Sequence, residues 1–117
     1  MTINTAQEAA GDANALKRLE RFGGVKLRQE ITTLFLQEAP SRIASARAAL
    51  GNGNVEGVRS VAHMLKSSSG QMGAIGMQKI CERLEDPEIS QDFSLALSDL
   101  EDELTRYIGW LETATLA

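Results

Sequence analysis

The chain has 117 residues and a formal net charge of −4, and 43% of its residues are hydrophobic but only 4% aromatic. This length suits one compact domain, and the hydrophobic share argues against a disordered chain. A protein that binds nucleic acid would show a basic face with interleaved aromatic residues, so this composition predicts no nucleic-acid partner.

The cysteine content and the hydropathy pattern bear on the cellular compartment. The single cysteine, Cys81, excludes an internal disulfide and favours a reducing compartment. No apolar run approaches the length of a membrane span, and the first residues have neither the basic nor the apolar region of a signal peptide. We therefore expect a cytoplasmic protein with no membrane partner.

The N-terminal part of the sequence predicts a flexible leader and a short helix. Residues 1–11 are small and polar and form the expected leader, and residues 12–117 form the single expected domain. Asp12 is the expected N-cap of a short helix, because its carboxylate can accept from free backbone N–H groups. Gly23 and Gly24 are expected to end this helix.

A long amphipathic stripe follows, from Val25 to Leu50, with apolar residues at helical spacing. Pro40 lies inside it and removes one backbone hydrogen bond, which predicts either a kink or two abutting helices. The stripe keeps its phase across Pro40, and this favours the kink. The "GNGN" run at 51–54 then predicts a turn, since Gly and Asn tolerate the left-handed conformation.

Two more helices are predicted in the middle of the chain. Asn54 can cap a helix that runs from Val55 to about Met72. The sequence "GAIG" at 73–76 weakens the helical pattern, and a shorter helix is expected from about residue 77 to residue 86.

The C-terminal segment carries the most regular helical stripe in the chain. Either Ser90 or Asp92 is expected to cap it. Its apolar residues recur every three or four positions: Phe93, Leu97, Leu100, Leu104, Ile108 and Leu111. Because short connections between long helices imply antiparallel neighbours, we predict an all-α fold. Its architecture is an antiparallel up-and-down four-helix bundle with a short additional N-terminal helix.

The segment "VAHMLKSSSGQMGA", residues 61–74, contains the only histidine of the chain. A lone histidine on a helix is commonly a core residue or an ordinary surface residue. On a helical wheel the apolar residues of this helix centre roughly 140° from His63, so the ring is expected to face outward. Lys66, Ser67 and Gly70 share the face of His63.

These neighbours favour a chemical role for the histidine. Lys66 lies one turn after His63, where its charge favours the neutral, nucleophilic ring and could neutralise an anionic group on it. Ser67 and Gly70 are small and leave the face open to another protein. The run Ser-Ser-Ser-Gly at 67–70 consists of poor or middling helix formers, which indicates selection for something other than helix stability.

Other chemistries fit the residues poorly. With one histidine and one cysteine, the chain lacks the ligands of a zinc site or of a carboxylate-bridged metal site. No strand precedes "SSSGQMG", which argues against a phosphate-binding loop, and the serines lack a nucleophile elbow. We expect no metal and no cofactor bound by this chain.

The stretch "AHMLKSSSGQMGA" at 62–74 resembles the signature of histidine-containing phosphotransfer (HPt) domains, and the similarity covers residues 27–86. The resemblance implies a helical bundle whose exposed histidine accepts a phosphoryl group from a receiver-domain aspartate and passes it to another. The implied partners are response-regulator receiver domains or a hybrid histidine kinase, with Mg²⁺ held by the partner receiver. The resemblance also implies a monomer.

Three site residues are carried over from the family motif. His63 matches the phospho-acceptor, and Lys66 matches the lysine that supports the phosphoryl group. Glu85 holds the position of a Gln or Glu that accepts a hydrogen bond from the ring nitrogen that is not phosphorylated. The alternative for Glu85 is a solvated acid on a helix surface.

The same resemblance implies a docking surface for the receiver domain. It comprises Arg59, Met64, Ser67, Gly70 and Gly73, of which the last matches the glycine that ends the motif helix. Ser67 departs from the family, which usually has glycine there to allow close approach of the receiver. This departure puts the fit of the partner in doubt more than the chemistry.

The expected function is that of a phosphoryl carrier without autokinase activity, because the sequence shows no nucleotide-binding motif. One alternative is a module of the same shape that binds a receiver or a kinase without carrying phosphate. Another is the dimeric histidine-bearing hairpin of a sensor kinase. Against it, Met64 follows the histidine where an acidic residue is usual, and no ATP-binding segment follows.

Overall fold

A computed structural model describes residues 10–114 of the chain. This described part is helical and contains no strand. Its helices are α2 (Ala13–Gly51), α3 (Val55–Met72), α4 (Ile75–Glu85) and α5 (Phe93–Ala114). The all-α class predicted from the sequence is therefore confirmed.

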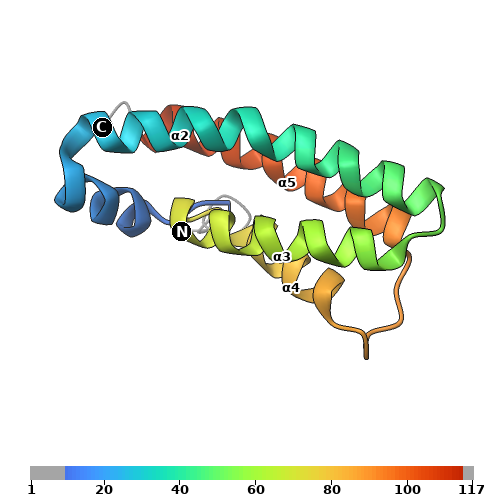
Figure 1. Cartoon of the computed structure of the whole chain (residues 1–117). Helices are drawn as coiled ribbons and strands as arrows, with labels where there is room; N and C mark the ends of the chain where they lie inside the picture. Colours follow the sequence, from blue (N-terminus) through green and yellow to red (C-terminus); the bar gives the residue numbers. More distant parts are fainter. Residues whose placement is uncertain (1–9, 115–117) are drawn as a thin grey trace, which may run out of the picture.

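The helices pack as a ring in which α2 and α4 each contact both α3 and α5. The most extensive contacts join α3 to α4 and α2 to α3. Figure 1 shows the chain reversing its direction between successive helices, with α2 and α5 along one side and α3 and α4 along the other. The core lies where these helices meet.

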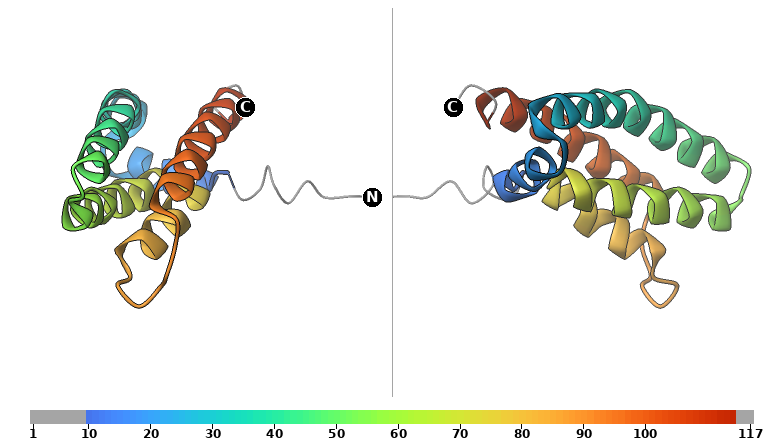
Figure 2. Two further views of the ribbon diagram at one scale, coloured as in Figure 1. Left: turned by 90° about the vertical axis from the view of Figure 1, so that its right-hand side faces the viewer. Right: turned by 60° about the vertical axis from the view of Figure 1, so that its left-hand side comes forward.

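The helix α2 is bent near its beginning. Gly23 (φ −147°, ψ 17°) and Gly24 (φ 77°, ψ −173°) have non-helical backbone angles, and only Gly24 needs the positive φ that glycine tolerates. The helix continues through Pro40, so two abutting helices are not found there. The non-helical backbone angles of α2 lie at the glycine pair. The first arm of α2, before Gly23, covers the residues for which a separate short helix was expected, and Figure 2 shows it folded back beside the end of α3.

The sequence signals for helix ends are confirmed at three N-termini. The side chains of Asp12, Asn54 and Asp92 accept hydrogen bonds from backbone N–H groups two or three residues later, at 3.0, 2.9 and 3.0 Å. Each bond satisfies a donor that the first turn of a helix leaves free. Of the predicted leader, residues 1–9 lie outside the described residues, and Ala10 is buried.

A buried aromatic cluster joins α5 to the end of α3. Tyr107 is fully buried, and its hydroxyl donates a hydrogen bond to the backbone carbonyl of Met72. Its ring meets Phe35 edge-on at 5.8 Å and stacks on Trp110 at 5.6 Å between centroids. Burial raises the pKa of the Tyr107 phenol well above its ordinary value, so the hydroxyl remains a donor.

The turn between α3 and α4 depends on Gly73. This residue closes α3 in the left-handed conformation, with φ 68° and ψ 24°. Its carbonyl accepts from the N–H of Asp12 at 2.8 Å. A Cβ atom at position 73 would lie 2.5 Å from the Asp12 carbonyl oxygen and 2.9 Å from the Cβ of Ala15. Gly73 was expected on the docking surface, but it is buried beneath the first arm of α2.

We predict that Gly73→Ala destabilises the protein by about 2–4 kcal/mol, because alanine there meets both an unfavourable φ and a steric clash. The matched control is Gly53→Ala, which also has a positive φ (73°) but open space around a Cβ. It should cost only about 1–2 kcal/mol. Urea unfolding followed by Trp110 fluorescence measures both, and equal losses would contradict the clash.

Candidate functional site

The tight turn after α3 sets which residues of α3 and α4 face one another. In a helical hairpin, residues at equal distances from the turn lie opposite each other, because both helices rise by the same step per residue. His63 and Glu85 each lie 11 positions from Ala74. Gly70 and Gln78 each lie 4 positions from it, and a Cβ at Gly70 would lie 2.9 Å from the Gln78 amide nitrogen.

The imidazole of His63 projects from α3 as the helical wheel predicts. Its side chain is 70% exposed, whereas its neighbours Ala62 and Leu65 are buried in the core. Its Nδ1 atom is hydrogen-bonded to Oε1 of Glu85 at the end of α4. Since a carboxylate can only accept, Nδ1 carries the proton and donates it. The lone pair of the neutral ring therefore lies on Nε2.

The carboxylate of Glu85 has partners on both of its oxygens. Oε1 meets Nδ1 of His63, and Oε2 meets Nζ of Lys66. The hydrogen bond from Lys66 is the main reason that the pKa of Glu85 is lowered; burial opposes this shift, and the bond to His63 adds to it. The same bond raises the pKa of Lys66. Glu85 is thus a carboxylate and Lys66 an ammonium at neutral pH.

Side-chain direction explains why Lys66 reaches Glu85. The residue opposite Lys66 on α4 is Glu82, since each lies 8 positions from Ala74. Helical side chains tilt toward the N-terminus of their helix, so the lysine leans along α3 toward His63. Glu85 lies opposite His63, and the lysine meets it there.

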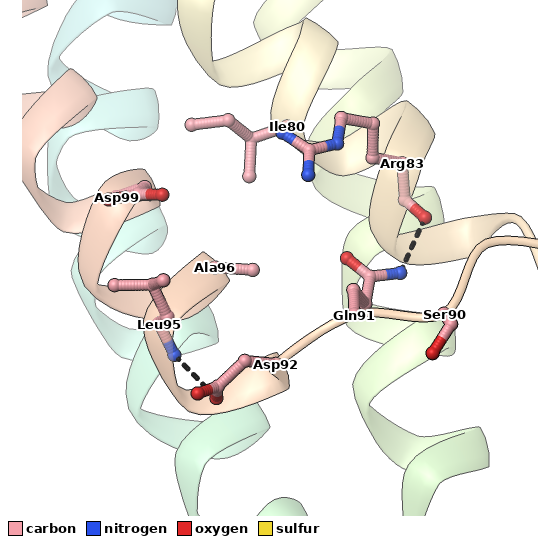
Figure 3. A pocket seen from close by; sticks show the side chains of 8 residues that line it. All are labelled: Ile80, Arg83, Ser90, Gln91, Asp92, Leu95, Ala96 and Asp99. Atoms are coloured by element: carbon pink, nitrogen blue, oxygen red, sulfur yellow. Dashed lines mark hydrogen bonds between the residues drawn. The ribbon is translucent and has the colours of Figure 1, made fainter.

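The loop after α4 holds the end of this helix in place. Gln91 donates from its side-chain amide to the backbone carbonyl of Arg83 at 2.8 Å, as Figure 3 shows. This bond ties the loop to the last turn of α4, which carries Glu85. Residues of α4, of this loop and of α5 form a hollow of about 110 Å³ that is separate from the predicted site residues. It is lined by Ile80, Arg83, Ser90, Gln91, Asp92, Leu95, Ala96 and Asp99.

Comparison with known proteins identifies the family. The family model described as "Hpt domain" matches residues 30–110, well over half of the chain. The chain belongs to the Hpt domain family. Its function is histidine phosphotransfer in a phosphorelay, and domains of this family interact with receiver domains and histidine kinases. Comparison with curated protein sequences gives no match.

Among solved structures, the HPt chain is similar to histidine-containing phosphotransfer protein B (HptB) from Pseudomonas aeruginosa PAO1. The TM-score is 0.80 at 23% sequence identity, and the match covers 92% of this chain and 96% of the other. This likeness concerns the fold, in which helices with largely different side chains take the same arrangement.

The predicted docking residues of the HPt domain lie in different surroundings. Met64 and Ser67 are exposed next to His63, and Gly70 is half-buried. Arg59 is half-buried; it donates to Glu56 at 2.8 Å and lies over the ring of Phe93, 5.9 Å from its centroid. The side chain of Arg59 is therefore turned toward α5.

The three serines of the motif, residues 67–69, differ in their exposure to solvent. Ser67 is exposed, while Ser68 donates from its hydroxyl to the carbonyl of Met64 at 2.8 Å. Ser69 is fully buried in the core. Only part of this run of small residues therefore faces outward.

One neighbour of the site was missed by the sequence analysis. Arg42 of α2 reaches the sulfur of Met64 at 3.2 Å and the carboxylate of Glu38 at 3.5 Å. Arg42 and Met64 each lie 11 positions from Gly53, in the turn between α2 and α3. The same counting from the turn could therefore have placed an α2 cation beside Met64, the residue after the histidine.

The described residues show neither a cluster of metal ligands nor a membrane-spanning helix. Among residues 10–114, no three His, Cys, Asp or Glu side chains gather where they could hold a metal ion. No helix within that range is long and apolar enough to span a membrane. Cys81, one turn before Glu85, is buried, and burial raises the pKa of its thiol to about 12.

We predict that the stabilising effect of Glu85 depends on pH. Its lowered pKa means that the folded protein favours the carboxylate, so this stability is present above the ordinary value of 4.5 and is lost as pH falls through the lowered value. Glu85→Gln should therefore be less stable than wild type at pH 7, with a gap that closes below about pH 4. Urea unfolding at several pH values measures this gap, and a gap that does not change with pH contradicts the ion pair.

Proposed function

We propose that His63 is the residue on which this HPt domain carries the phosphoryl group between receiver-domain aspartates. The observation that carries the proposal is the exposed ring whose Nδ1 donates to the carboxylate of Glu85. This bond orients the ring and leaves Nε2 as the nucleophile. Lys66, one turn after His63 and paired with Glu85, would supply a positive charge to the phosphoryl group.

In the proposed transfer, the Nε2 lone pair attacks the phosphorus of an aspartyl phosphate in line. The N–P bond forms as the P–O bond breaks, and the electron pair of that bond stays on the aspartate carboxylate. The proton on Nδ1 remains on the ring beside Glu85. We expect the receiver to supply Mg²⁺ and this chain to bind no cofactor.

We propose that the receiver docks over the exposed face around His63. Met64 is 44% exposed and offers an apolar contact, and Arg42 lies against it. Ser67 is small and exposed and lets another surface approach closely, whereas Gly70 is half-buried where a Cβ would meet Gln78 of α4. The hydroxyl of Ser67 adds bulk where the family usually has glycine, so we expect it to influence which receivers fit.

We further propose that this protein is a cytoplasmic monomer without autokinase activity. A carrier of this kind receives its phosphoryl group from a partner and has no use for ATP. We interpret residues 12–117 as one domain, an antiparallel up-and-down four-helix bundle in which the first arm of α2 serves as the short N-terminal helix.

We predict that wild type accepts acid-labile, base-stable phosphate from a phosphorylated receiver domain and that His63→Gln does not. Phosphate on an imidazole nitrogen has this stability pattern, and glutamine offers no ring nitrogen. Incubation with labelled phospho-receivers, followed by acid and base treatment, measures it. Phosphate on the variant would contradict the assignment of His63. A wild type that binds receivers without accepting phosphate would favour the non-transferring module.

We predict that Lys66→Ala folds normally and transfers phosphate about 10-fold to 100-fold more slowly, because it removes one cation from the transition state. The matched control is Lys79→Ala, which removes an exposed lysine from α4. Rapid-quench transfer from a labelled receiver measures both rates. Unchanged transfer by Lys66→Ala would remove Lys66 from the mechanism.

A further inference from the structure

We propose that Glu85 limits how much phosphate remains on His63, because it competes with the phosphoryl group for Lys66. The proposal rests on the carrier function of His63 and adds a control on the equilibrium of transfer. Glu85 would then be a positioning residue with two roles, since it orients the ring and withholds the lysine. The result is a carrier that releases its phosphoryl group readily to the next receiver.

The first observation is that Lys66 is already engaged in the unphosphorylated protein. Its Nζ contacts Oε2 of Glu85, and both side chains are largely shielded, at 34% and 22% exposed. The lysine has a single positive charge, which is here compensated by a carboxylate. A phosphoryl group on Nε2 would therefore meet a cation whose charge is shared with Glu85.

Phosphoryl transfer changes the net charge of the cluster formed by His63, Lys66 and Glu85. With a neutral ring, His63, Lys66 and Glu85 have a net charge of zero. Transfer puts a dianionic phosphoryl group on Nε2 and leaves a cationic ring with its proton on Nδ1, so the cluster becomes −1. Without the charge of Glu85, the cluster would go from +1 to neutral. The net charge therefore favours the phosphorylated state more when position 85 is uncharged, while the attraction between Glu85 and the cationic ring acts in the opposite direction.

Glu85→Gln separates the two roles. The glutamine keeps an amide oxygen that can accept from Nδ1, so the ring keeps its orientation. Its other polar group is an NH₂ donor, which cannot accept from Lys66. The ammonium is then free to pair with the phosphoryl oxygens. Glu82→Gln is the matched control, because Glu82 is exposed on α4 and lies outside the bonds to His63 and Lys66.

The experiment measures how labelled phosphate distributes at equilibrium between the full chain and a receiver domain that has been phosphorylated with acetyl phosphate in the presence of Mg²⁺. We expect Glu85→Gln to shift the ratio toward His63 roughly threefold to fivefold relative to wild type. Glu82→Gln should change it by less than about twofold. Adding Lys66→Met to Glu85→Gln should abolish the gain, because the gain is made by the freed lysine.

Three outcomes would overturn the proposal. An unchanged or smaller share of phosphate on Glu85→Gln would show that the carboxylate does not compete for Lys66. Equal shifts in Glu85→Gln and Glu82→Gln would show a general effect of negative charge on α4. A gain that survives Lys66→Met would exclude the lysine as its source. A wild type that accepts no phosphate would instead contradict the carrier function on which the proposal rests.

Discussion

The ionised carboxylate of Glu85 links the two helices that form the site. One oxygen accepts from the ring of His63 and the other from Lys66, so the last turn of α4 holds both functional side chains of α3. Because the carboxylate can only accept, it decides which ring nitrogen has the proton and which has the lone pair. An exposed histidine would otherwise sample several rotamers and both tautomers. The chemistry of this HPt domain follows from that constraint.

A turn and two hydrogen bonds outside the site hold Glu85 opposite His63. Gly73 allows α3 to reverse directly into α4, and the turn fixes the register of the two helices. Tyr107 secures the end of α3 from α5, and Gln91 secures the end of α4 from the following loop. A shift of the register by one residue would rotate Glu85 by about 100° around α4 and take it away from the ring.

Much of the fold could be predicted from the sequence because helix ends and helix faces are local properties. Asn54 is the N-cap of the helix that was expected from Val55. The apolar stripe of that helix correctly predicted that His63 faces outward. The bond between Lys66 and Glu85 depends on how two helices meet, which periodicity within one helix does not specify. The burial of Gly73 depends on the first arm of α2, more than 50 residues away in the sequence. Hydrophobic periodicity within single helices predicts neither the bond between Lys66 and Glu85 nor the burial of Gly73.

Whether Glu85 fixes the ring of His63 with its proton on Nδ1 can be measured by ¹⁵N NMR of the unphosphorylated protein. The spectrum is recorded at a pH where the ring is neutral, and the two nitrogen shifts report the tautomer. The structure predicts the Nδ1–H tautomer in wild type and in Glu85→Gln, which keeps an acceptor oxygen, and its loss in Glu85→Ala. A wild-type ring that has its proton on Nε2 would show that Glu85 does not set the tautomer of His63.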